Sequence, residues 1–116
     1  MSGAGGSVDG VRLLAPETVS AATRLQTDAW DEVRRMPVRK GLGYRLGEGG
    51  TPTSFGHTGG GGNLGFADPG LDMSFAYVKN LHGGRKLLAE QQAAAGTSNP
   101  AHYIAHVVRQ ALINPS

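Results

Sequence analysis

Hydrophobic and polar positions alternate with a period of two through the middle of the chain, which is the pattern of β-strands. Residues 41–47 alternate clearly, and residues 54–58 and 63–67 form two further short segments of this kind, joined at a run of glycines. In residues 71–80 both alternating faces are apolar or small, which favours a central strand covered on both sides. The pattern therefore predicts three to four antiparallel strands.

Towards each end of the chain the hydrophobic positions recur with the period of a helix. Pro16 suits the first position of a helix and Glu17 suits its first turn, so we expect a short helix over residues 16–27. Residues 84–96 are helix-prone, and a clearer pattern begins at Pro100. Its apolar stripe consists of Ile104, Val107, Val108, Ala111 and Leu112. This stripe predicts a C-terminal helix packed on one face of the sheet.

Together these elements predict an α+β fold with a short N-terminal helix, an antiparallel sheet of three to four strands and a C-terminal helix packed on one face. The length of 116 residues suffices for one small domain. Residues 30–40 are expected to be irregular, because Pro37 would end any helix there. We interpret Trp30 as a packing anchor or as a residue at the edge of a cleft.

The composition removes several classes of function. The 11 Lys and Arg residues nearly balance the 9 Asp and Glu residues, and no basic stripe is interleaved with aromatic residues, so we expect no nucleic-acid partner. The chain has no cysteine, which excludes disulfides and thiolate chemistry. No apolar run approaches the ~20 residues that cross a bilayer, so no membrane-spanning segment is expected. We interpret the basic residues Arg34, Arg35, Arg39 and Lys40 as a solvated face.

Glycine is the most unusual feature of the composition, with 19 residues, and four of them are consecutive in the stretch SFGHTGGGGNLGFADP at residues 54–69. A solvent-exposed hairpin explains these glycines, with His57 merely exposed at the end of a strand. One wall of an active site explains them as well, because Gly59 and Gly60 lack a Cβ and let a substrate lie against the strand. The residues alone leave both interpretations open.

The stretches DGVRLLAPET, GHTGGGGNLGFADP and FAYVKN, in this order, resemble the C-terminal part of the serine β-lactamase-like hydrolases. This superfamily includes class C β-lactamases, penicillin-binding transpeptidases and family VIII carboxylesterases. Its third signature is Lys-Thr-Gly on a strand that lines the active site. The sequence His57-Thr58-Gly59 stands in that place, as in the esterase-like members. The resemblance extends over nearly the whole chain.

The resemblance implies a role for each residue of this segment. The residue after the signature supplies an N–H group to the oxyanion hole, which here is the backbone N–H of Gly60. His57, Thr58 and Gly59 would contact the substrate, a small-molecule ester or amide. His57 replaces the usual lysine and removes a permanent positive charge, which favours an ester over a β-lactam carboxylate. The resemblance implies neither a metal nor another cofactor.

The other signatures of the superfamily do not occur in this chain. No serine is followed three positions later by lysine, and neither Tyr-x-Asn nor Ser-Asp-Asn occurs. We therefore expect residues 1–116 to be the C-terminal portion of a single β-lactamase-related domain, without its N-terminal strands and without the helical subdomain that carries the nucleophile. Met1 would then mark a truncated or misplaced start, and the chain alone should be inactive. The alternative is a non-catalytic remnant that binds a partner or self-associates through an exposed sheet edge.

Other groups of residues suggest chemistry that the sequence does not support further. The glycine run lacks the Gly-Lys-Ser/Thr of a P-loop. His102 and His106 have the i, i+4 spacing of a shared metal site, but no third ligand is evident. Ser54 and His57 fall on opposite faces of a strand, so they form no catalytic pair. Asp68 begins a turn, where an aspartate bonds its own backbone.

Overall fold

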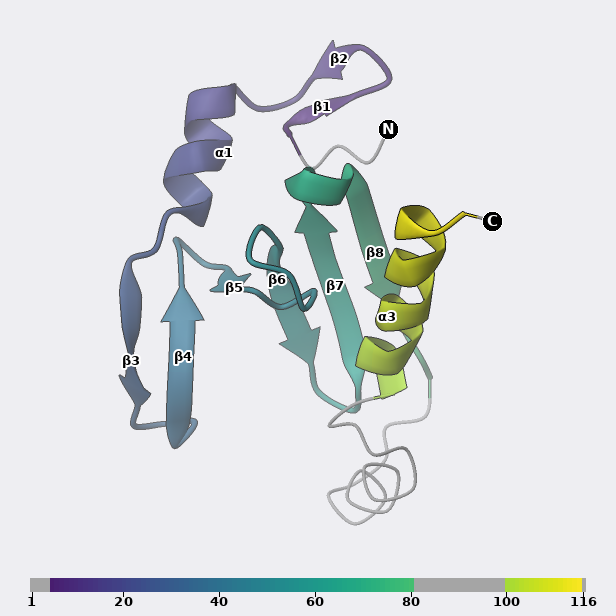
Figure 1. The fold of residues 1–116 in the computed structure, drawn as a ribbon. Coiled ribbons are helices and arrows are strands. Elements are labelled where there is room, and N and C mark those ends of the chain that lie inside the picture. The colour runs from purple at the N-terminus through teal and green to yellow at the C-terminus, as the bar shows by residue number, and fades with distance from the viewer. Residues whose placement is uncertain (1–4, 81–99, 116) are drawn as a thin grey trace. The chain divides into compact units, whose positions relative to one another are not determined.

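The computed structural model describes residues 5–80 and 100–115, and Figure 1 shows how they form helices and strands. The α-helices of this part of the chain are α1 (Pro16–Thr23) and α3 (Pro100–Ile113), and the short 3-10 helix is η1 (Pro69–Leu71). The strands are β1 (Ser7–Val8), β2 (Val11–Arg12), β3 (Thr27–Asp31), β4 (Met36–Lys40), β5 (Arg45–Leu46), β6 (Phe55–Gly59), β7 (Asn63–Asp68) and β8 (Met73–Tyr77). The helix-prone residues 84–96 lie outside the described part. None of the helices in the described residues has the length and apolarity needed to cross a membrane.

In the described part of the chain the main sheet contains six strands in the order β3-β4-β5-β6-β7-β8, while β1 and β2 form a separate hairpin. The pairings of β3 with β4, β4 with β5 and β5 with β6 are antiparallel. The expected α+β fold with an antiparallel sheet is therefore confirmed, whereas the expected number of three to four strands was too low. The strands of this sheet that the sequence pattern missed are β3 and β4. Strand β4 and the last two residues of β3 lie in residues 30–40, which were expected to be irregular.

Strands β3 and β4 escaped the hydrophobic pattern because Val38 is the single buried residue on the two of them. They pair in register over their full length, with Pro37 opposite Trp30. A proline is tolerated there because, in the described residues, β4 pairs with β5 only at Lys40 opposite Arg45. Trp30 is 55% exposed and is not a packing anchor.

Two of the expected strands differ from the prediction. In residues 41–47 only Arg45–Leu46 forms a strand, because Gly43 adopts a positive φ of 83°. Strand β8 is the last in the sheet order of the described residues, and Ser74 and Ala76 are exposed on it, so the expectation of a central strand covered on both sides was wrong. Serine and alanine suit an exposed face as well as a covered one, so the pattern could not distinguish the two.

The helices begin at Pro16 and Pro100, as the sequence predicts. Helix α1 ends at Thr23, before the expected end, because Arg24 is already extended. Helix α3 buries Ala101 and Ala105. Four members of the predicted apolar stripe are instead 37–54% exposed, namely Ile104, Val107, Val108 and Leu112. The helix packs through alanines because a small side chain lets its backbone come close to a neighbouring element.

The chain divides into two compact units, each with a small buried core. Unit 1 consists of Met1–His57 and Phe66–Ser74, and unit 2 of Thr58–Gly65 and Phe75–Ser116. Among residues 5–80 and 100–115, the buried apolar side chains of unit 1 are Val38, Phe66 and Met73, and those of unit 2 are Leu64, Ala101 and Ala105.

Candidate active site

The residues of the predicted active-site wall follow one another along β6 and into the turn after it (Figure 1). His57 and Gly59 are exposed, whereas Thr58 is half-buried. Successive side chains of a strand point to opposite faces, which accounts for the different exposure of His57 and Thr58. Gly60 is exposed at the first position of the turn between β6 and β7. A small molecule can therefore approach the backbone at the end of β6.

Two positions of the turn at residues 60–62 require glycine for their backbone conformation. Gly61 and Gly62 adopt φ angles of 80° and 100°, and both are buried. A residue with a Cβ is strained in this left-handed region. A Cβ added to Gly59 would lie 3.2 Å from the Cβ of Asn63, closer than ordinary contacts allow. Backbone geometry and close packing thus explain the glycine run.

Asn63, the first residue of β7, holds this turn through its side-chain amide. Its Nδ2 donates a hydrogen bond to the carbonyl oxygen of Gly60 at 3.0 Å. Its Oδ1 accepts a hydrogen bond from the backbone N–H of Lys79, also at 3.0 Å. The hydrophobic pattern and the motifs of the sequence did not point to Asn63, although an asparagine beside a glycine turn is a residue type that commonly bonds backbone groups.

Asp68 ends β7 and is completely buried. Its carboxylate accepts hydrogen bonds from the hydroxyls of Thr51 and Thr53 and from the backbone N–H of Gly70, the last at 3.0 Å. The bond from Gly70 confirms the expected turn in which Asp68 bonds its own backbone. Burial raises the pKa of Asp68, but these hydrogen bonds lower it by more, so the pKa lies below its usual value. The carboxylate is therefore held ionised as an anchor of unit 1.

The hydroxyl of Ser54 both donates and accepts a hydrogen bond with the backbone. It donates to the carbonyl oxygen of Thr51 and accepts from the N–H of Gly49, each at 2.9 Å, and Ser54 is 1% exposed. With Phe55 and Pro69, Ser54 lines part of a pocket of about 280 Å³ in unit 1. Because its proton and its lone pair are already used by the backbone, Ser54 is suited to structure and not to nucleophilic attack.

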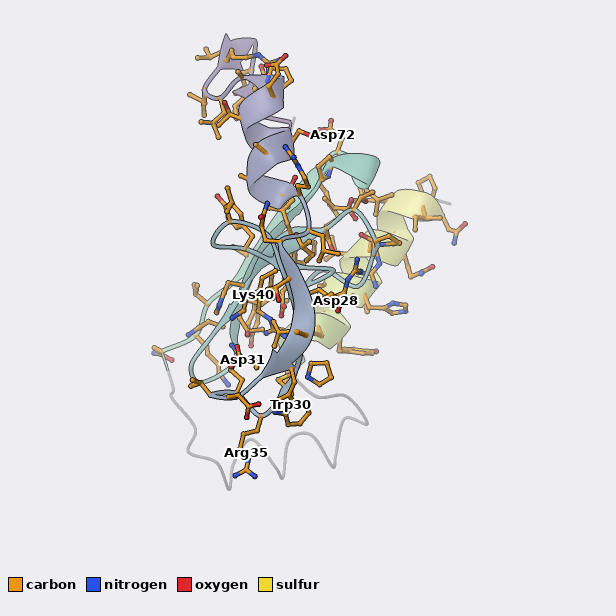
Figure 2. The ribbon with its side chains drawn as sticks, turned by 90° about the vertical axis from the view of Figure 1, so that its left-hand side faces the viewer. Asp28, Trp30, Asp31, Arg35, Lys40 and Asp72 are labelled. Carbon is orange, nitrogen blue, oxygen red and sulfur yellow. The ribbon has the colours of Figure 1, made fainter. Side chains whose placement is uncertain are left out.

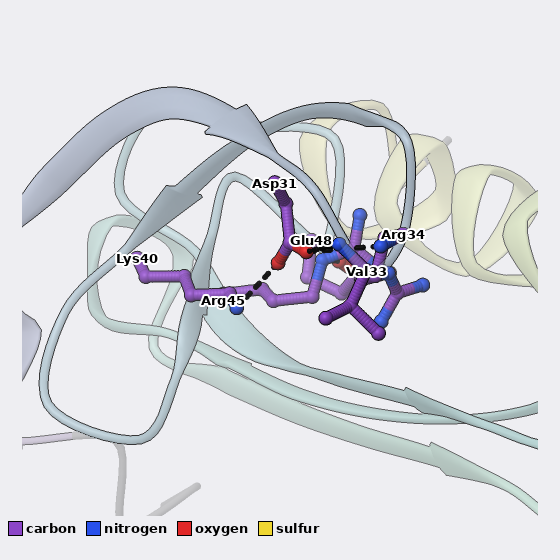
Figure 3. A network of polar contacts seen from close by, with 6 residues as sticks. All are labelled: Asp31, Val33, Arg34, Lys40, Arg45 and Glu48. Atoms are coloured by element: carbon purple, nitrogen blue, oxygen red, sulfur yellow. Dashed lines mark hydrogen bonds and ion pairs between the residues drawn. The ribbon is translucent and has the colours of Figure 1, made fainter.

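Asp31 organises a second turn, between β3 and β4 (Figures 2 and 3). Its carboxylate accepts from the N–H groups of Val33 and Arg34 at 3.0 and 2.9 Å and from the Nζ of Lys40 at 3.0 Å. The hydrogen bond from Arg34, followed by that from Lys40, holds the pKa of Asp31 below its usual value. This turn is a polar structural feature of unit 1.

Two of the basic residues near this turn are paired with acids. Lys40 bonds Asp31, and the Nε of Arg39 lies 3.6 Å from a carboxylate oxygen of Asp28. The side chains of Arg39 and Asp28 are more than half exposed, so this pair contributes only ~0–1 kcal/mol to stability. The interpretation of the basic cluster as a solvated face agrees with this exposure.

A more buried ion pair lies on β5 and in the loop after it. The Nε of Arg45 lies 3.2 Å from a carboxylate oxygen of Glu48, and both side chains are largely covered (Figure 3). Removal of one partner would leave the other charge poorly solvated, which is the costly way to break such a pair. The pair is therefore a fixed structural element of unit 1.

Helix α3 carries both histidines of the considered metal site. His106 is exposed, and its Nδ1 lies 3.2 Å from a guanidinium nitrogen of Arg109, a position that disfavours a second cation. Within residues 5–80 and 100–115, no group of three or more His, Cys, Asp and Glu side chains could hold a metal ion. The described residues thus offer no donor set for a metal.

An antiparallel sheet followed by a helix is the arrangement of the serine β-lactamase-like class. The family model for Beta-lactamase matches residues 4–97, and the chain belongs to this family.

Two known proteins show how the chain relates to this family. Over 109 residues it is 32% identical to the esterase/beta-lactamase LipL of Mycobacterium tuberculosis, a match that covers 92% of this chain and 24% of LipL. The crystal structure of a novel penicillin-binding protein homolog from Caulobacter crescentus is similar with a TM-score of 0.63 and 37% identity, over 68% of this chain and 23% of that one. The chain thus spans about a quarter of the length of either relative.

Proposed function

We propose that residues 1–116 are the C-terminal portion of a β-lactamase-related serine hydrolase of the esterase type. The observation that carries this proposal is the position of Gly60. It is exposed directly after the His-Thr-Gly strand, at the start of a turn whose next two glycines are buried. The match to about a quarter of each relative supports a portion of a longer fold.

In the proposed mechanism the nucleophile is a serine that does not lie in this chain. That serine attacks the carbonyl carbon of an ester while a nearby lysine takes its proton. The carbonyl oxygen becomes an oxyanion, and the backbone N–H of Gly60 donates a hydrogen bond to it. Collapse of the intermediate expels the alcohol and leaves an acyl-serine, which water then hydrolyses. The chain contributes stabilisation of the developing negative charge.

The same segment would bind the substrate. Gly59 has no side chain to keep the substrate from the strand, and His57 and Thr58 would contact its polar groups. An ester is favoured over a β-lactam because His57 stands where the β-lactamases carry a lysine. The relative LipL is described as both an esterase and a beta-lactamase, so the choice of an ester rests on His57.

The second candidate function is a binding or self-associating module. The observation that favours it is the exposed apolar face of α3, formed by Ile104, Val107, Val108 and Leu112. In the hydrolase portion this face would be covered by the rest of the fold, whereas in the module a second copy of the chain would cover it. Sedimentation equilibrium over a wide concentration range separates them, since only the module forms a defined dimer.

The direct test is hydrolysis of a short-chain p-nitrophenyl ester, together with labelling by a fluorophosphonate serine probe. The 116-residue chain alone should show neither turnover nor labelling, because it lacks the Ser-x-x-Lys nucleophile. A chimera in which the chain replaces the matching 109-residue segment of LipL should show both. Turnover with stoichiometric labelling of the chain alone would overturn the proposal, because the nucleophile would then lie within it.

A further inference from the structure

The side chain of Asn63 connects the Gly59–Gly60 backbone to the backbone of Lys79, all within unit 2. Its amide donates to the carbonyl oxygen of Gly60 and accepts from the N–H of Lys79, which follows β8. Its Cβ also packs so close to Gly59 that an added Cβ there would lie 3.2 Å away. The glycine turn is thereby tied to the chain that leaves β8.

These contacts bracket the peptide group that carries the Gly60 N–H. That N–H belongs to the peptide bond between Gly59 and Gly60. On one side Gly59 packs against Asn63, and on the other side the Gly60 carbonyl accepts a hydrogen bond from it. Asn63 thus restrains the backbone on both sides of this peptide group.

We propose that Asn63 is a positioning residue, which fixes the direction of the Gly60 N–H in the oxyanion hole; this inference rests on the proposed function of Gly60. Oxyanion donors act because they are oriented before the charge develops. Gly61 and Gly62 have no side chains of their own to restrict the turn, whereas the side chain of Asn63 bonds it directly.

The amide is the chemical group that this position requires. A backbone carbonyl needs a donor and a backbone N–H needs an acceptor, and asparagine supplies both at once. Aspartate keeps the acceptor for Lys79 but, when ionised, loses the donor for Gly60. Alanine loses both. The two substitutions therefore separate the two hydrogen bonds.

The first measurement is amide hydrogen exchange of Lys79, by NMR on the full 116-residue chain. Asn63→Ala should accelerate this exchange by about tenfold, as expected for the loss of one hydrogen bond, and Asn63→Asp should leave it close to the original rate. Asn114→Ala, at an exposed asparagine after the end of α3, serves as the matched control. Unchanged exchange of Lys79 in Asn63→Ala would overturn the inference, whether or not the chimera hydrolyses the ester.

The second measurement is steady-state hydrolysis by the LipL chimera. Both Asn63→Ala and Asn63→Asp should lower kcat by about tenfold with little change in KM, because each loses the bond to Gly60 that orients the N–H. If Asn63 had a merely structural role, kcat would change only in the variant whose Lys79 exchange changes. Asn63→Ala would then lower kcat, and Asn63→Asp would have the kcat of the unchanged chain. That outcome would overturn the inference.

The failure of the proposed function gives a different result. If Gly60 is not the oxyanion donor, Gly60→Pro leaves kcat of the chimera unchanged while Asn63→Ala still accelerates the exchange of Lys79. If only the positioning role fails, Gly60→Pro lowers kcat and the Asn63 variants do not. The two experiments together therefore assign a failure to one statement or to the other.

Discussion

Two turns of this chain are each held by a polar side chain, but the side chains and their partners differ. The turn between β3 and β4 is held by the Asp31 carboxylate, which bonds two N–H groups of its own turn and the side chain of Lys40. The turn between β6 and β7 is held by the Asn63 amide, which bonds Gly60 and the distant Lys79. The first network stays within one hairpin, whereas the second ties a hairpin to the chain after β8.

The two turns also differ in whether side chains cover their backbone. Every residue of the β3–β4 turn carries a side chain, and its residue with positive φ, Arg35 at 55°, is not a glycine. The β6–β7 turn consists of glycines, of which Gly60 is exposed. The proposed role of Gly60 agrees with this difference, because no side chain at that position stands between the backbone N–H and a substrate.

The largest expected difference between the two turns is the effect of a proline substitution on kcat. In the LipL chimera, Gly60→Pro removes the proposed oxyanion donor and should lower kcat by about 10²–10³. Val33→Pro removes an N–H that bonds Asp31, in a hairpin to which we assign no catalytic role, and should leave kcat unchanged. The measurement is kcat for a p-nitrophenyl ester with both variants at equal fluorophosphonate labelling.

Gly60→Ala is the control for this pair, because it keeps the N–H and Gly60 is not among the glycines with positive φ. It should retain far more activity than Gly60→Pro. Equal losses in the two Gly60 variants would point to a steric effect and would count against the donor role.

The sequence predicted the glycine turn better than the β3–β4 turn. The His-Thr-Gly strand, the glycine run and the Asp68 turn were evident because glycine, proline and aspartate have specific backbone preferences. The β3–β4 hairpin was missed because its strands bury only Val38 and are held by polar contacts, which leave no hydrophobic period. Asn63 was missed for another reason, since its partner Lys79 lies 16 positions away and only the folded chain brings the two together.

The stability of the chain should depend on pH through Asp68, the buried carboxylate at the end of β7. Its pKa in the folded chain is lowered, so its contribution to stability is present above the unfolded pKa of ~3.9 and is lost as pH falls through the folded value. Asp68→Asn should cost about 1–3 kcal/mol at pH 7, because it weakens hydrogen bonds to a buried charge.

The check on Asp68 is urea unfolding at neutral pH and again below pH 4. The difference between Asp68→Asn and the unchanged chain should shrink progressively as the pH falls below about 4, and should vanish once the pH is below the lowered pKa of the folded state. Asn63→Gln, which carries no titratable group, should show the same difference from the unchanged chain at both pH values. A constant difference for Asp68→Asn would show that its ionisation does not stabilise unit 1.

The smallest contrast concerns the residues with positive φ in the two turns. Gly62→Ala places a Cβ at φ 100° and should destabilise the chain by about 1–2 kcal/mol. Arg35→Gly removes the same kind of strain at φ 55°, and the gain should stay below about 1 kcal/mol because glycine also loses more entropy on folding. Both changes in the free energy of unfolding are measured by urea unfolding. A decrease for Gly62→Ala and an increase for Arg35→Gly would show that left-handed backbone is strained in both turns and that only the β6–β7 turn relieves the strain with glycine. If Arg35→Gly were instead destabilising, the Arg35 side chain would contribute to the β3–β4 turn, and the contrast between a turn with side chains and a bare turn would become sharper.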